Sequence, residues 1–78
     1  MKINEVISLR INRLCKERHL TTNGLAVKSG LRQSTVSNII SGASKNPTIH
    51  SLQRICDGLG ISLKDFFDDS VFEGNNGD

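Results

Sequence analysis

Four uncharged polar side chains, Gln33, Ser34, Ser37 and Asn38, lie close together in the segment TTNGLAVKSGLRQSTVSNIISG, which covers residues 21–42. Amides and hydroxyls hydrogen-bond with the edges of DNA bases, because Gln and Asn can each pair with N6 and N7 of adenine and Ser can donate or accept. A helix face that meets only water more often carries Lys and Glu. The alternative interpretation is a poorly formed surface helix, since Ser, Thr and Asn are weak helix formers.

Two short helices are predicted to position these side chains. The first starts at Thr21 or Thr22 and ends at Ser29-Gly30-Leu31, where Gly30 can adopt the left-handed conformation that stops a helix. The second spans residues 33–41, and Gly42 ends it in the same way. A rotation of about 100° per residue places one apolar side (Val36, Ile39, Ile40) opposite one polar side (Ser34, Ser37, Asn38, Ser41). Such a pair is a helix-turn-helix, whose second helix can lie in a DNA major groove.

Three further helices complete an all-α prediction. One covers about residues 4–18, one follows the capping residue Thr48 and ends at Gly60, and the last, LKDFF, follows a capping box formed by Ser62 and Asp65. The apolar residues recur at helical spacing, which directs one face of each helix toward a common core. Those residues are Ile3, Val6, Ile7, Ile11, Leu14 and Cys15, then Ile49, Leu52, Ile55, Cys56 and Leu59, then Leu63, Phe66 and Phe67. A chain of 78 residues has room for one compact five-helix domain.

Charge divides the chain into two parts. Residues 1–64 contain all ten Lys and Arg and three acids, a net charge of +7, whereas residues 65–78 contain five acids and no base. A basic compact body suits a surface that binds phosphates. We therefore expect a helix-turn-helix domain over residues 1–68 and an acidic, flexible tail over 69–78. In that tail Val71 and Phe72 can either dock onto a second subunit or pack back onto the domain.

Several function classes are disfavoured by what the sequence contains. His19 and His50 are far apart and have no Cys, Asp or Glu at ligand or triad spacing, and the glycines form no phosphate-binding loop. We expect no enzyme activity, no metal and no cofactor. The N-terminus lacks the continuous apolar run of a signal peptide or a membrane span, so a cytoplasmic location is expected. There Cys15 and Cys56 should stay buried thiols.

From about Val6 to Phe67 the chain resembles the DNA-binding domain of lambda repressor and Cro, the XRE family of helix-turn-helix proteins. The resemblance rests on LRINRLCKERHLT, LAVKSGL, QSTVSNIISG, NPTIHSLQRICDGLG and ISLKDFF, in that order. It implies a lambda repressor-like five-helix fold and the binding of double-stranded DNA. The family's base-reading positions correspond to Gln33, Ser34 and Asn38, with Ser37 beside them. Its phosphate-contacting positions correspond to Thr22, Arg32, Ser44 and Lys45.

The sequence departs from the family pattern at three places. Thr22 stands where many relatives carry the longer glutamine, and Arg32 stands where a Ser or Thr usually caps the second helix of the motif. Cys15 and Ile40 replace an arginine and a glutamate that often pair inside related domains. Exchanging both members of a buried ion pair for apolar groups is often neutral or stabilising, so we expect Cys15 and Ile40 to be in contact.

Taken with the resemblance, these observations predict a sequence-specific transcriptional regulator, a repressor of the phage, prophage or mobile-element type. Family members usually act as dimers, here through the last helix and the tail (Phe66, Phe67, Val71, Phe72), with half-sites about 34 Å apart. With no Arg or Lys on the polar face, the recognised site should favour A·T pairs. The alternative is an antitoxin that also binds its own operator and whose acidic tail binds a basic toxin partner.

Overall fold

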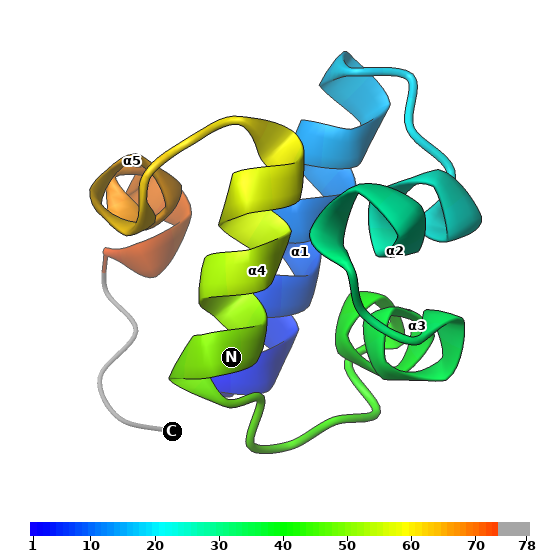
Figure 1. Cartoon of the computed structure of the whole chain (residues 1–78). Coiled ribbons are helices and arrows are strands. Elements are labelled where there is room, and N and C mark those ends of the chain that lie inside the picture. Colours follow the sequence, from blue (N-terminus) through cyan, green and yellow to red (C-terminus); the bar gives the residue numbers. More distant parts are fainter. Residues whose placement is uncertain (74–78) are drawn as a thin grey trace.

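The computed structural model describes residues 1–73 and contains five α-helices and a terminal 3-10 helix in that part of the chain (Figure 1). They are α1 (Ile3–Glu17), α2 (Thr22–Ser29), α3 (Gln33–Ser41), α4 (Ile49–Leu59), α5 (Leu63–Phe67) and η1 (Ser70–Phe72). The all-α, five-helix prediction is confirmed. Figure 1 shows α2 and α3 on one side of the molecule and α5 on the opposite side.

Local signals at the helix ends explain why the helices begin and end where they do. The hydroxyls of Thr21, Thr48 and Ser62 each accept a hydrogen bond from the backbone N–H three residues later, as is usual for Ser and Thr that cap a helix. Gly30 and Gly42 have φ angles of 67° and 80°, a region that glycine enters without steric cost. These two glycines end α2 and α3 and so fix the limits of the helix-turn-helix.

The core contains most of the predicted apolar residues, but three of them differ from the prediction. Ile3, Ile49 and Phe67 are 43%, 66% and 40% exposed. Ile3 and Ile49 occupy the first position of α1 and α4, and Phe67 occupies the last position of the five-residue α5. Helical spacing assigns a residue to a face, but it does not say whether a neighbouring element extends far enough to cover that face at a helix end.

Arg10 interrupts the apolar face of α1 because it connects that helix to the C-terminal elements. Its Nε donates to the Phe66 carbonyl at 2.8 Å, its Nη2 to the Asp65 carbonyl at 3.0 Å, and its Nη1 to Asp69 Oδ2 at 3.0 Å. The guanidinium also lies 6.0 Å from the centre of the Phe66 ring. One partly buried cation thus holds α5 and the start of η1 against α1.

The described part of the predicted tail packs on the domain. The Phe72 ring lies 5.0 Å from the ring of Phe67 and 5.9 Å from that of Phe66, and Phe72 packs against the core. Of the two alternatives, the structure thus shows packing on the parent domain for Phe72, and residues 70–72 form a 3-10 helix where a frayed tail was expected. The rest of that tail, residues 74–78, lies outside the described residues.

Candidate nucleic-acid interface

Helix α3 has one buried side and one exposed polar side. Val36 and Ile39 are 0% and 3% exposed and belong to the core. On the other side the four predicted base-contacting residues are all exposed, and we call them the reading face: Gln33, Ser34, Ser37 and Asn38. Figure 1 shows α3 at the edge of the molecule with its outer side free of other helices. These four side chains are therefore accessible from outside the molecule.

The turn between α2 and α3 is fixed by backbone and side-chain hydrogen bonds. The Leu31 N–H donates to the Ala26 carbonyl at 3.2 Å, and Arg54 Nε from α4 donates to the Ser29 carbonyl at 3.1 Å. Gly58 of α4 lies so close to α2 that a Cβ there would be 2.6 Å from Ser29 Oγ. Close packing of α4 on α2 holds the first helix of the motif in place.

The predicted phosphate-contacting residues lie at the start of α2, directly before α3 and in the loop that follows α3. Arg32 directly precedes α3 and is exposed, and its side chain forms no cap, as expected. Beyond α3, Lys45 is exposed and Ser44 is half-buried, with its N–H donating to the Asn38 carbonyl at 3.0 Å. Thr22 is the half-buried first residue of α2. The two cations thus border α3 at its start and beyond its end.

A hollow of about 430 Å³ lies beside the reading face. Its walls come from α3, the following loop and the start of α4, and no charged side chain is among the lining residues: Thr35, Asn38, Ile39, Ala43, Ser44, Asn46, Pro47, Thr48 and Ser51. Because Asn38 lines both the hollow and the reading face, the two form one continuous surface. Hydroxyl and amide groups dominate its polar part.

Sequence reasoning missed three side chains of α1 that bind the C-terminal end of α3. Asn4 Nδ2 donates to the Gly42 carbonyl at 2.9 Å, Asn12 Nδ2 donates to the Ile40 carbonyl at 3.0 Å, and Ser8 Oγ also donates to the Ile40 carbonyl. Their spacing of four residues, which puts them on one helix face, was the available signal. The last carbonyls of a helix have no partner within the helix, and these donors supply one.

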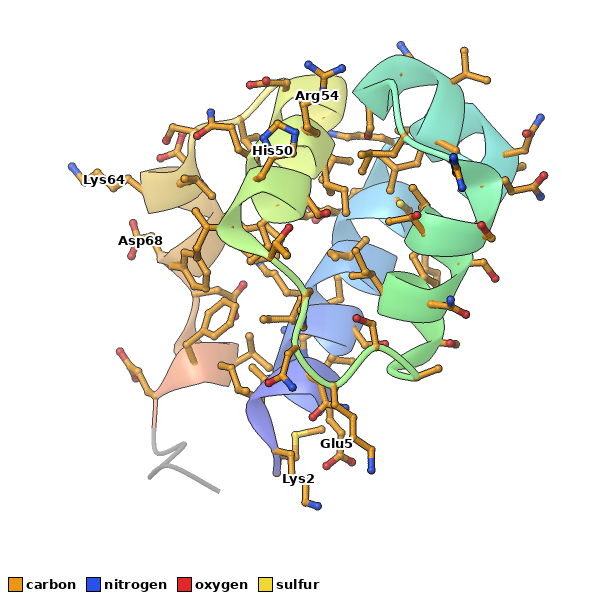
Figure 2. The ribbon with its side chains drawn as sticks, turned by 60° about the horizontal axis from the view of Figure 1, so that its bottom comes forward. Lys2, Glu5, His50, Arg54, Lys64 and Asp68 are labelled. Atoms are coloured by element: carbon orange, nitrogen blue, oxygen red, sulfur yellow. The ribbon has the colours of Figure 1, made fainter. Side chains whose placement is uncertain are left out.

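Several other ionisable groups lie on α1, on α4 and at α5. Figure 2 shows Lys64 of α5 and Asp68 just after α5 pointing outward, on the opposite side of the molecule from α3. Arg54 extends from α4 to the turn between α2 and α3, where it donates to the Ser29 carbonyl. At the start of α1, which Figure 2 marks with Lys2 and Glu5, the Lys2 N–H donates to the Glu5 carboxylate at 3.0 Å.

Neither a metal centre nor a membrane span is found within residues 1–73. That part of the chain has no group of three His, Cys, Asp or Glu side chains able to hold a metal ion, and each of its helices is too short or too polar to cross a bilayer. Burial raises the pKa of the Cys15 thiol above its ordinary value. Burial, with a contribution from Asp57, raises the pKa of the Cys56 thiol to about 11. Both are buried free thiols, as expected.

The contact expected between Cys15 and Ile40 stays a prediction. Cys15 is a buried member of the hydrophobic cluster, and Ile40 is partly buried against the same cluster.

Comparison with known proteins matches the chain to helix-turn-helix proteins. A family model described as "Cro/C1-type HTH DNA-binding domain" matches residues 10–70. The HTH-type transcriptional regulator SlrR of Bacillus subtilis (strain 168) is 37% identical over 60 residues, which cover 76% of this chain. The match covers 40% of SlrR, so the chain spans about two fifths of the length of that relative.

Two solved structures have the same fold. The prophage Lp1 protein 11 is 40% identical, with a TM-score of 0.79 and 97% of each chain covered. A tyrosine-to-phenylalanine mutant of the restriction-modification controller protein C.Esp1396I is 35% identical, with a TM-score of 0.76 and 86% of each chain covered.

Proposed function

The chain belongs to the Cro/C1-type helix-turn-helix DNA-binding domain family, and from this membership we propose that it is a sequence-specific repressor of the phage or mobile-element type. It is a transcriptional regulator of the Cro/C1 type. The narrower role is supported by its similarity to a prophage protein and to a restriction-modification controller. In this role α3 enters the major groove of an operator and excludes the transcription machinery by occupancy.

The observation that carries the proposal is the reading face. Gln33, Ser34, Ser37 and Asn38 are all exposed on the side of α3 opposite the buried Val36 and Ile39. Amide and hydroxyl groups can read base edges, and the absence of Arg and Lys from this face favours A·T pairs over G·C pairs. We assign base contacts to these four residues.

Phosphate contacts supply affinity and set the register of α3 on the duplex. We assign them to Thr22 at the start of α2, to Arg32 directly before α3, and to Ser44 and Lys45 in the loop after α3. Arg32 replaces a side-chain cap with a cation, and a contact between a guanidinium and a phosphate is charge-assisted and therefore strong. The net charge of +7 on residues 1–64 supports this assignment.

A symmetric pair of domains would read two half-sites about 34 Å apart. We propose a homodimer through α5 and η1, with one change to the contact set expected from sequence. Phe66 is 0% exposed and is a core residue, so the contact must use the 40% exposed Phe67 together with the half-buried Val71 and Phe72. The alternative role as an antitoxin with a toxin partner has no specific observation in its favour.

In vitro selection of duplex DNA, followed by binding measurements on the selected and a scrambled sequence, tests the function. Selection should return an A·T-leaning site with two-fold symmetry. Asn38→Ala should lower discrimination between the two duplexes by about 1 to 3 kcal/mol, because an amide that pairs with adenine is lost. Equal weakening on both duplexes would show that Asn38 does not read bases. If the wild-type chain selects no sequence, the proposed function is wrong.

A further inference from the structure

The sequence of α3 has a low intrinsic helix propensity. Its sequence, QSTVSNIIS, consists of β-branched, Ser, Asn and Gln residues, most of which lie in the lower part of the helix-propensity scale. It has no side-chain cap at its start, no acid in its first turn and no base in its last turn. Its nine residues are also fewer than an isolated helix needs to be stable in water. Contacts from elsewhere in the molecule must therefore hold it.

Core packing supplies only part of what is needed. Val36 and Ile39 bury one side of α3 in the core, but the hydrophobic effect that favours this burial has no direction of its own. A base-reading helix needs a defined position, because hydrogen bonds to base edges lose strength when donor and acceptor are misplaced. Hydrogen bonds to the α3 backbone are directional and can therefore fix the position of α3.

A polar stripe on α1, formed by Asn4, Ser8 and Asn12, makes those directional contacts. Ser8 and Asn12 both donate to the Ile40 carbonyl, Asn12 at 3.0 Å, and Asn4 donates to the Gly42 carbonyl at 2.9 Å. The Asn12 amide also donates to the Ser8 carbonyl at 2.8 Å. The Asn12 amide thereby connects the backbone of α3, at Ile40, to the backbone of α1, at Ser8.

The contact is close as well as directional. A Cβ on Gly42 would lie 3.8 Å from Ser8 Cβ, so the end of α3 rests on the surface of α1. The two elements are far apart in sequence, with a separation of 28 positions from Asn12 to Ile40 and of 38 positions from Asn4 to Gly42. Loss of these bonds would free the end of α3 that carries Ser37 and Asn38, while its start at Gln33 stays attached to the turn.

We propose that Asn4, Ser8 and Asn12 are positioning residues that set the specificity of the reading face by fixing the C-terminal end of α3. The inference rests on the proposed function, since it concerns how the same surface recognises DNA. It predicts a graded effect along α3. Discrimination at base pairs read by Asn38 should depend on the stripe, and discrimination at base pairs read by Gln33 and Ser34 should depend on it much less.

The experiment uses a double variant that carries both Ser8→Ala and Asn12→Ala. It is compared with the wild type and with the control variant Ser62→Ala. Ser62→Ala removes one capping hydrogen bond at α5 and so lowers stability at a site far from α3. Affinity for a duplex with a single selected half-site, which does not require pairing through α5, relative to a scrambled duplex should fall about tenfold in the double variant, the size expected for hydrogen bonds of this kind. Renewed selection should show relaxed preference mainly at the base pairs of Asn38. Ser62→Ala should leave the ratio unchanged.

A conservative variant separates positioning from simple structural loss. In the Asn12→Ala background, Ser8→Thr keeps a hydroxyl and should recover discrimination relative to Ser8→Ala. The inference is overturned if the double variant keeps the wild-type ratio, if Ser62→Ala lowers the ratio as much, or if affinity falls equally on both duplexes. The last result would indicate that the stripe contacts phosphates directly.

Amide hydrogen exchange tests the same contacts without DNA. The Gly42 N–H is bonded to the Ile39 carbonyl at 3.2 Å and the Ser44 N–H to the Asn38 carbonyl at 3.0 Å. Both amides should exchange faster in Ser8→Ala alone than in Ser62→Ala, and unchanged exchange would overturn the inference. If the wild-type chain prefers no DNA sequence, the proposed function fails while this measurement still decides whether the stripe holds α3.

Discussion

Individual cations of this domain have separable roles because they lie on different sides of the molecule. Lys45 follows α3 and is exposed, whereas Lys64 is exposed on α5 and points away from α3 (Figure 2). Lys45→Ala should weaken binding to all DNA sequences alike and reduce the slope of log affinity against log salt concentration by about 0.9. Lys64→Ala, which removes the same charge elsewhere, should leave that slope nearly unchanged. Titrations between low and moderate salt would measure both, and equal slope changes would argue against the assignment of Lys45.

The Cys56 thiol links the stability of the domain to alkaline pH. Burial raises its pKa in the folded protein to about 11, so the folded state keeps the proton to higher pH than the unfolded state. This contribution to stability is complete below the ordinary thiol pKa and is lost as pH rises toward 11. Urea unfolding should show a lower free energy of unfolding at pH 10 than at pH 8. This difference between the two pH values should be smaller in Cys56→Ala than in the wild type. An identical decrease in the variant would assign the effect to other groups.

At the scale of elements, Arg10 connects α1 to α5 and η1 through three hydrogen bonds. Its side chain is 12% exposed, and bonds from a charged donor contribute about 1.5 to 3 kcal/mol. Arg10→Ala should therefore lower the free energy of unfolding by about 2 to 4 kcal/mol. Arg13 lies 3.6 Å from Asp69 and is 52% exposed, so Arg13→Ala should cost less than about 1 kcal/mol. Chemical denaturation of both variants would measure these changes. Similar losses of unfolding free energy in Arg10→Ala and Arg13→Ala would refute this role of Arg10.

The limits of the helices were predictable because the signals are local. Thr21, Thr48, Ser62, Gly30 and Gly42 all act within a few residues of their own position, and the predicted bounds agree with the structure to within about a residue. The polar side of α3 followed from helical rotation alone.

Contacts of side chains with distant carbonyls were not predictable from the sequence. Arg10 binds the carbonyls of Phe66 and Asp65, and Asn12 binds that of Ile40. Every residue has a backbone carbonyl, so the acceptor leaves no mark in the sequence, and only the fold brings it near its donor. The same reasoning applies to Arg54 and the Ser29 carbonyl.

For the molecule as a whole, α5 lies on the opposite side from α3, so a second copy can bind there without covering the reading face (Figure 1). Phe67 is the exposed aromatic residue of that side, at 40% exposure. Phe67→Ser should weaken self-association and should reduce operator affinity more than affinity for a single half-site. Sedimentation of wild type and variant with and without operator DNA would measure this. A wild-type chain that stays monomeric on a two-half-site operator would exclude the proposed pairing.

The stripe on α1 has a consequence for how this domain could acquire new targets. Asn4, Ser8 and Asn12 bind main-chain oxygens, which are present whatever amino acid occupies the position. The outward side chains of α3 can therefore be exchanged while the scaffold that aims them stays the same. A library randomised at Gln33, Ser34, Ser37 and Asn38 should yield folded variants with altered operators, and an evolving lineage could follow the same route.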